Sequence, residues 1–147
     1  MLNRFGAFVT GITACYKYIQ RIKSMEMTEL GLKGTHVMCL FYLHHHPEGL
    51  TAAELCQLCG EDKAAISRTL AELENRGCLY TEAVDGKKYR ARLYLTQMGL
   101  QQAQRIDSLI ADWVSIGGDG LSEQERADFY RILGLIAENL KEHYNKG

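Results

Sequence analysis

The segment from residue 51 to residue 95 constrains the fold more than any other part of the chain, because its hydrophobic period changes midway from that of a helix to that of a strand. A capping box that begins at Thr51 predicts a short helix over residues 52–58. Asp62 is placed as the N-cap of a longer helix over residues 63–76. The connection between them is short and contains a glycine, which is typical of a helix-turn-helix.

The second half of this segment predicts a β-hairpin. Residues 78–83 have the pattern of a strand, and apolar and polar side chains alternate again from Tyr89 to Leu95. Asp85-Gly86 lies between these strands and favours a tight turn. A hairpin that directly follows a helix-turn-helix predicts a winged helix.

Apolar residues at spacings of three and four predict further helices on both sides of this core. The first covers residues 3–24. The second contains residues 37–43 and ends near Pro47, the only proline of the chain. A fifth helix begins at Thr96 and stops in a glycine-rich stretch, and a sixth follows a second capping box and ends near residue 144.

We therefore predict a single domain over residues 1–147, mainly α with a small β-hairpin (α+β). In this prediction residues 35–96 form a winged-helix lobe, and residues 1–30 and 97–147 supply long N- and C-terminal helices. A domain of this size cannot easily bury the long apolar stripe of the first helix, so we expect that stripe to pack against a partner surface.

Composition excludes several classes of protein. The chain has 46% hydrophobic and 24% charged residues, which is ordinary for a globular domain. Its apolar runs are far shorter than the ~18 residues that span a bilayer, no signal-peptide pattern begins it, and its five cysteines favour reduced thiols. We expect a cytoplasmic protein. It has no phosphate loop, nucleophile motif or recognisable carboxylate pair, so we expect neither enzymatic activity nor a cofactor.

Charge is distributed unevenly along the chain. The net charge is −1, but residues 84–92 of the predicted hairpin contain four basic residues against Asp85 alone: Lys87, Lys88, Arg90 and Arg92. Local charge decides whether counterions are released from a phosphate backbone, so these residues are candidates for contacts with nucleic acid. The alternatives are a solvated hairpin tip, or a protein-interaction module whose basic finger binds an acidic protein surface.

The helix over residues 63–76 is the candidate for reading DNA bases, because the second helix of a helix-turn-helix enters the major groove with its N-terminal side chains toward base edges. Arg68 is the expected specificity residue, since arginine binds guanine through two hydrogen bonds. The alternative is an ordinary exposed helical face. The candidate contacts in the helix-turn-helix are Thr51, Lys63, Ala64, Ser67, Arg68 and Thr69.

The chain resembles the MarR family of bacterial transcriptional regulators between Leu32 and Gly99. The most specific residues are Asp62, Ile66-Ser67-Arg68, Leu70, Leu73, Gly77 and Leu79, followed by Leu95-Thr96-x-x-Gly99. The resemblance implies a homodimer, with dimerisation through the first, fifth and sixth helices, that represses transcription at a pseudo-palindromic operator in double-stranded DNA. The alternative is a monomer whose terminal helices fold onto its own core.

The predicted wing departs from the family pattern. Members often carry an Asp-x-Arg motif in the wing, in which the aspartate orients the arginine for the minor groove. Lys87 and Tyr89 occupy these positions here, while Arg90 lies one position later and Asp85 two positions earlier. We therefore treat the basic residues of the wing as a group.

The resemblance also implies a response to a small molecule. Relatives often bind aromatic or phenolic effectors in a cleft between the DNA-binding lobe and the dimerisation helices, which releases the DNA. The alternative is that the candidate side chains are plain core residues. The candidate effector-binding residues are Tyr16, Met38, Tyr42 and Trp113.

Two groups of residues have the chemistry of metal ligands. His44-His45-His46 are consecutive, and neighbours on a helix point ~100° apart, so we do not expect all three to bind one ion. At a helix C-terminus they complement the dipole. Cys56 and Cys59 have a ligand-like spacing, but the chain has no second such pair. We therefore predict core packing for these cysteines and no metal site.

Overall fold

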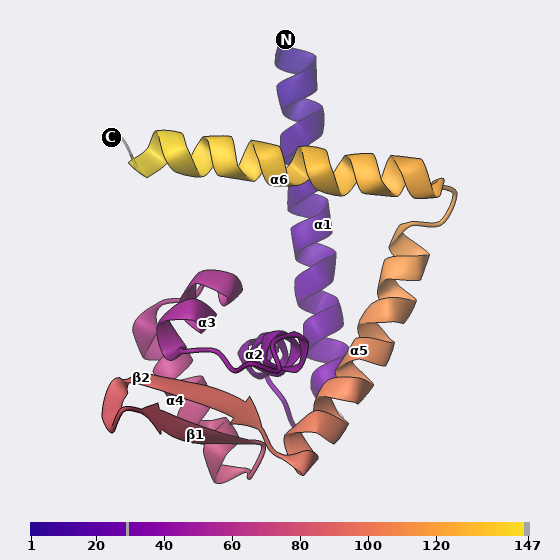
Figure 1. Ribbon diagram of the computed structural model, residues 1–147. Helices are drawn as coiled ribbons and strands as arrows, with labels where there is room; N and C mark the ends of the chain where they lie inside the picture. The colour runs from indigo at the N-terminus through magenta and orange to yellow at the C-terminus, as the bar shows by residue number, and fades with distance from the viewer. Residues whose placement is uncertain (29, 146–147) are drawn as a thin grey trace. The chain divides into compact units, whose positions relative to one another are not determined.

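The computed structural model describes residues 1–28 and 30–145, without the side chains of residues 26, 27, 88 and 89. The predicted order of helices and strands is confirmed, and so is the fold class (Figure 1). The residues form two compact units, Met1–Leu109 and Ile110–Gly147. The elements are α1 (Leu2–Thr28), α2 (Gly34–His45), α3 (Ala52–Cys59), α4 (Lys63–Asn75), β1 (Leu79–Val84), β2 (Lys87–Leu95), α5 (Gln97–Gly117) and α6 (Glu123–Asn145).

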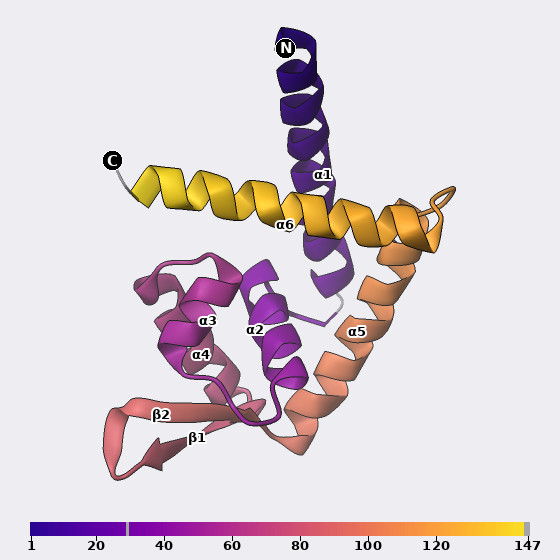
Figure 2. The same ribbon diagram turned by 45° about the horizontal axis from the view of Figure 1, so that its top comes forward.

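The core of the first unit lies between α2, α3, α4 and the base of the hairpin, and Figure 2 shows the three helices side by side next to the hairpin. Leu40 on α2 and Leu55 on α3 are fully buried there. Ile66, Leu70 and Leu73 are spaced at i, i+4 and i+7, so they share one face of α4 and enter the same core. Burial of this face leaves the opposite face of α4 toward solvent.

The predicted caps of α3 and α4 are confirmed. The Thr51 hydroxyl accepts the Glu54 N–H at 3.2 Å, and the Glu54 carboxylate accepts the Thr51 N–H at 2.7 Å. Helix α3 ends at Gly60, whose φ of 64° lies in the left-handed region that favours glycine. Asp62 then accepts the Ala65 N–H at 2.7 Å. This short turn therefore determines where α4 begins.

Strands β1 and β2 form the predicted antiparallel hairpin. Asp85 and Gly86 have φ angles of 54° and 70°, the positive values that a two-residue type I′ turn requires. Strand β2 begins at Lys87, two residues before the predicted Tyr89, because the turn is only two residues long. The basic residue that follows the turn is therefore already part of the sheet.

The motif that joins the hairpin to α5 depends on a close approach of two backbones. The Thr96 N–H donates to the Cys78 carbonyl at 3.0 Å, and the Thr96 hydroxyl accepts the Gly99 N–H at 3.2 Å. Thr96 therefore caps α5. A Cβ atom on residue 99 would lie 1.9 Å from the Cys78 carbonyl oxygen, so only glycine fits at this position.

Helix α1 is four residues longer at its C-terminal end than predicted and is exposed over most of its length. Its C-terminal part approaches α2, where Lys23 lies beside Gly34. The apolar stripe that predicted the helix remains uncovered in the single chain. Its exposed members include Phe5, Phe8, Val9, Ile12, Tyr16 and Ile19.

The second unit contains the end of α5 and all of α6. Ser122 and Glu125 form the predicted capping box at the beginning of α6, with distances of 3.2 Å and 2.8 Å. No residue of α6 is buried, although the helix carries large apolar side chains such as Phe129 and Leu135. Among the residues that the structure describes, no helix combines the length and apolarity needed to cross a membrane.

Candidate nucleic-acid interface

The first half of α4 carries five of the ten predicted DNA contacts. Lys63, Ala64, Ser67 and Arg68 are all exposed, because Ile66 and the other apolar residues of the helix turn the opposite face into the core. Small and polar side chains at the beginning of a helix allow its backbone to approach a groove closely. This surface is therefore the candidate for contact with base edges.

Two of the predicted contacts have different surroundings. Thr69 is 7% exposed, so its side chain lies mainly against the core. Thr51 is half-buried, and its hydroxyl oxygen already accepts a hydrogen bond from the N–H of Glu54. Contacts of these two residues with DNA stay predictions.

A cavity of about 150 Å³ lies between the beginning of α2 and one side of α4. It places Lys33 and Arg68, both cations, near the N-terminus of α2, where the helix dipole favours a negative group. Sequence reasoning missed Lys33 and Thr35, because it examined only the two helices of the predicted pair. A basic residue directly before α2 is the signal that could have indicated them. The cavity is lined by Lys33, Thr35, His36, Ala65, Arg68, Thr69 and Glu72.

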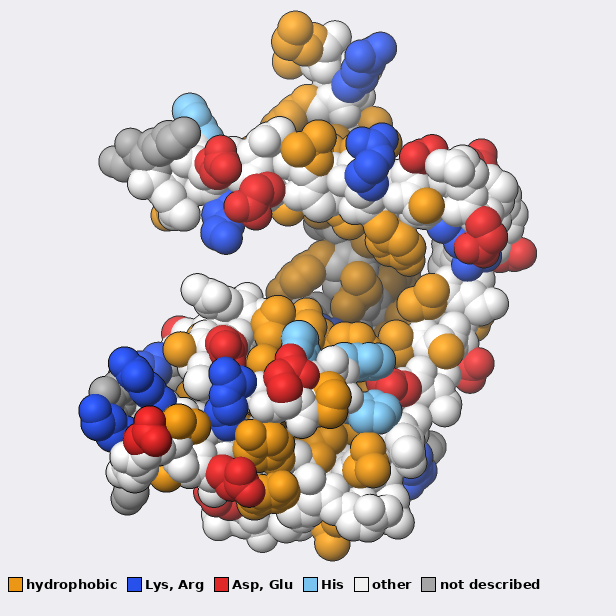
Figure 3. Space-filling view, viewed as in Figure 1, with side chains coloured by type: hydrophobic (Ala, Val, Ile, Leu, Met, Phe, Trp, Pro, Cys, Tyr) orange, Lys and Arg blue, Asp and Glu red, His pale blue; other side chains and the backbone are white. Residues whose placement is uncertain are grey.

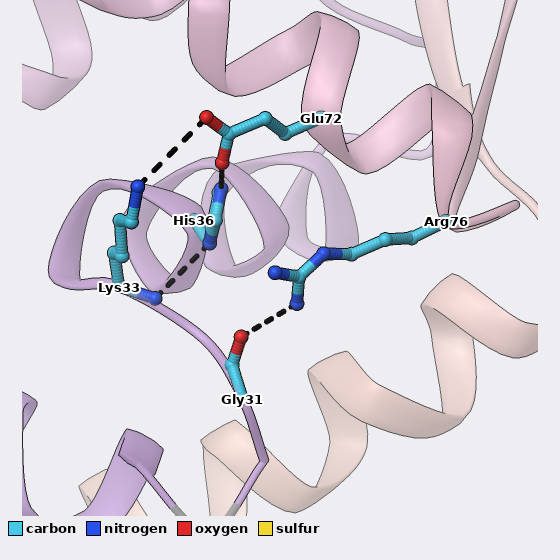
Figure 4. Close-up of polar contacts among 5 residues, drawn as sticks. All are labelled: Gly31, Lys33, His36, Glu72 and Arg76. Atoms are coloured by element: carbon cyan, nitrogen blue, oxygen red, sulfur yellow. Dashed lines mark hydrogen bonds and ion pairs between the residues drawn. The ribbon is translucent and has the colours of Figure 1, made fainter.

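His36 connects α2 to α4 (Figure 4). Its side chain is 1% exposed. Nδ1 accepts a hydrogen bond from the backbone N–H of Lys33 at 3.0 Å, so the ring proton is on Nε2. Nε2 therefore donates a hydrogen bond to the Glu72 carboxylate at 2.7 Å. The backbone donor therefore selects one neutral tautomer of the imidazole.

Electrostatics at this contact follow from its geometry. Burial lowers the pKa of His36, and the hydrogen bond to Glu72 opposes that effect. The same hydrogen bond, with the charge of Lys33 at 3.9 Å, lowers the pKa of Glu72. Directly after α4 ends, the Arg76 guanidinium donates to the Gly31 carbonyl at 2.6 Å (Figure 4). Together these contacts hold α4 to the segment before α2 and fix its direction.

Basic side chains gather over the hairpin (Figure 3). Lys87 and Arg90 are exposed, whereas the side chain of Lys88 lies outside the described residues. Arg92 is half-buried and donates to the carbonyl of Gly49 at 2.8 Å, so it also stabilises the base of the wing. Contacts of the four basic residues with DNA stay predictions.

The four candidate effector residues do not gather around one described cavity. Tyr16 is 63% exposed and Trp113 is 37% exposed, and Trp113 belongs to the second unit. Met38 and Tyr42 are half-buried on α2, and burial raises the pKa of Tyr42. A cavity of about 410 Å³ in the first unit has other walls: Leu43, His44, His46, Pro47, Tyr80, Tyr94, Leu95 and Leu100.

The histidines and cysteines near the end of α2 separate into distinct contacts. His46 pairs with Glu48 at 2.8 Å, whereas His44 and His45 both contact Asp107 on α5. Cys39 is buried and shares a hydrogen bond with Cys59, which raises the pKa of Cys39 and lowers that of Cys59. Cys56 and Cys59 are only half-buried.

Part of the sequence matches a known protein family, and the fold is similar to solved structures. Residues 30–88 match the model of the MarR family. The chain is similar in structure to the transcriptional regulator SlyA, with 22% identity and a TM-score of 0.81 over 94% of this chain and 96% of that one. It is similar to S. aureus MepR in a complex with DNA (18% identity, TM-score 0.77, 88% and 93% covered) and to MarR (24% identity, TM-score 0.73, 94% and 94% covered).

Proposed function

The chain has the fold of the MarR-family transcriptional regulators, and from this premise we propose that it is a regulator that binds specific sequences in double-stranded DNA. The observation that carries the proposal is the exposed first half of α4, whose apolar face is fixed in the core. Arg68 offers two parallel donors to a guanine, and Ser67 offers a hydroxyl to a base or a phosphate. Glu72 and Glu74 limit the contact to this first half, because carboxylates repel phosphates.

Phosphate contacts on both sides of α4 would set its position on the duplex. Lys33 and Thr35 lie at the beginning of α2, and the wing carries Lys87, Lys88 and Arg90. Such contacts fix the register of a protein on DNA but carry no sequence information. The solved complex of MepR with DNA supports the choice of DNA as partner.

A homodimer accounts for the uncovered apolar surface of the terminal helices. Phe5 on α1 and Leu140 on α6 are 67% and 61% exposed, and each belongs to a row of exposed apolar residues. Exposed apolar surface of this extent marks a site of association. A two-fold dimer would present two copies of α4 to half-sites about one DNA turn apart, ~34 Å, so the operator is a pseudo-palindrome.

The dimer proposal is tested by the introduction of charged side chains on the apolar stripe of α1. Phe8→Glu with Ile12→Glu places two carboxylates on the apolar stripe, and we expect light scattering to find monomers. Thr10 is exposed and lies off the stripe, so Thr10→Glu is the matched control and leaves the dimer intact. A double variant that remains dimeric at the concentration of the wild-type protein would show that the stripe is not the interface.

Repression follows if the operator overlaps a promoter, because a bound dimer occupies the site. A small aromatic effector would release the protein only by binding the DNA-incompetent form of the dimer more tightly than the competent form. Tyr42 and Met38 are the half-buried candidates for that contact. A regulator of this kind acts in the cytoplasm, where the DNA is.

The test of specific DNA binding is Arg68→Ala. We expect the variant to lose ~1–3 kcal/mol of discrimination at one base position in each half-site, because one bidentate contact is removed. Arg105 on α5 is also exposed, so Arg105→Ala is the matched control and keeps the wild-type preference. If neither wild type nor variant binds DNA with a salt-dependent affinity, the protein-interaction module replaces this proposal.

A further inference from the structure

Three potential metal ligands converge where the end of α2 meets α5. Nδ1 of His44 lies 2.9 Å from Oδ2 of Asp107, and Nε2 of His45 lies 3.2 Å from the same oxygen. One ligand atom from each of the three residues lies within 4.8 Å of the other two. Histidine side chains gather on one face of the first unit beside an acidic group (Figure 3).

The two histidines reach one point although they are consecutive on a helix. His44 uses the ring nitrogen nearer its backbone, and His45 uses the farther one. The different reach compensates for the ~100° between neighbouring side chains on a helix. The third ligand, Asp107, lies on α5, so the run of histidines alone could not predict it. His46 points to Glu48 and takes no part.

The spacing of these atoms fits a metal ion. In a tetrahedral zinc site with bonds of ~2.0 Å, neighbouring ligand atoms lie about 3.3 Å apart. The two distances to Oδ2 are 2.9 Å and 3.2 Å, and the two ring nitrogens lie within 4.8 Å of each other. Small side-chain movements therefore suffice to admit an ion in place of the two ring protons that now face Asp107.

The site is sheltered but accessible. The side chains of His44 and Asp107 are 23% and 27% exposed, and that of His45 is 50% exposed. Three protein ligands leave a fourth coordination position for water. Two imidazoles and one carboxylate with an open position form a ligand set that suits zinc and similar divalent ions.

We propose that His44, His45 and Asp107 bind one divalent transition-metal ion, zinc in the first instance, which bridges α2 and α5. The inference concerns this chain's own ligands and does not depend on DNA binding. The ion takes the ring nitrogens that face Asp107, and the proton of each neutral imidazole moves to its other ring nitrogen, because histidine binds a metal as the neutral ring.

The experiment titrates tag-free, reduced protein with Zn²⁺ in competition with a chromophoric chelator, and with Co²⁺ followed by its visible absorption. We expect one ion per chain and a tetrahedral cobalt spectrum without a thiolate charge-transfer band. Asp107→Asn and His44→Gln should each weaken zinc binding at least about 100-fold, because even the loss of an outer partner of a ligand costs 10–100-fold. His46→Gln is the matched control and keeps wild-type affinity.

Thermal unfolding supplies a second readout. Zinc should raise the unfolding temperature of the wild-type protein and of His46→Gln, but not that of Asp107→Asn, because a ligand stabilises only the state that binds it. Asp107→Asn is nearly isosteric, and its metal-free unfolding temperature shows whether it is folded. Three results would overturn the proposal: no zinc bound by wild type, unchanged zinc affinity in both ligand variants, or a thiolate band that assigns the ion to the cysteines.

Discussion

Nε2 of His36 lies 2.7 Å from Oε2 of Glu72, so a buried imidazole on α2 holds the second half of the helix that we propose reads DNA. Nδ1 of the same ring accepts the backbone N–H of Lys33. A second proton on the ring would sit on Nδ1 and face the backbone N–H of Lys33, so the hydrogen bond between them would be lost. The arrangement is therefore stable only while the imidazole is neutral.

We expect the free energy of unfolding to decrease as the pH falls below the ordinary His36 pKa of 6.5. Burial lowers this pKa in the folded protein, so between the two values the unfolded chain binds a proton that the folded chain does not. The contribution of His36 is fully present above pH 6.5 and is lost as the pH falls to the folded value. Glu72, whose pKa is also lowered, adds a loss below its ordinary 4.5.

Urea unfolding from about pH 8 to pH 5 measures this effect. His36→Phe removes the titrating ring, so its stability should depend less steeply on pH than that of the wild type. The other histidines are present in both proteins and cancel in the comparison. Identical pH dependences would mean that His36 is not protonated differently in the two states.

Replacement of Gly99 tests the close approach between α5 and the backbone of Cys78, which lies just before β1. We expect Gly99→Ala to lower the free energy of unfolding by ~1–3 kcal/mol, because the new methyl group would meet the carbonyl oxygen of Cys78. Gly134 is also helical and has no atom within 4 Å of an added Cβ, so Gly134→Ala should be neutral or stabilising by up to ~1 kcal/mol. Equal effects of the two changes in urea unfolding would contradict this account.

The features that local sequence predicted are those in which each residue acts on near neighbours. The capping boxes at Thr51 and Ser122 involve residues three apart, and the turn at Asp85-Gly86 depends on two adjacent residues. The spacing of Ile66 and its partners likewise places a whole face of α4 in the core. For this reason the element order and the exposed face of α4 could be predicted.

The contacts that sequence did not predict join residues far apart in the chain. His36 and Glu72 are separated by 36 positions, Gly49 and Arg92 by 43, and His44 and Asp107 by 63. Neither hydrophobic period nor charge pattern contains this information, because it depends on how helices pack. The role of Arg92 at the base of the wing is one result that a count of basic residues could not have given.

The wing is tested by Lys87→Ala together with Lys88→Ala. If the two lysines contact phosphates, operator DNA and random DNA should both bind more weakly, by similar factors. The slope of log K against log salt should become shallower by about 0.9 for each phosphate that the variant no longer neutralises. Lys141→Ala on α6 removes an exposed lysine elsewhere and is the control. Wild-type affinity and salt slope in the double variant would show that neither Lys87 nor Lys88 touches DNA.

The central claim is that the chain reads a specific DNA sequence through a pair of α4 helices. Its most direct test is the set of sequences that the purified protein enriches from a random pool of double-stranded DNA. We expect an inverted repeat whose half-sites lie about 10 base pairs apart, centre to centre, and whose preference at one position per half-site is lost in Arg68→Ala. A pool that remains random after repeated rounds, with protein that is folded and dimeric, would contradict the account.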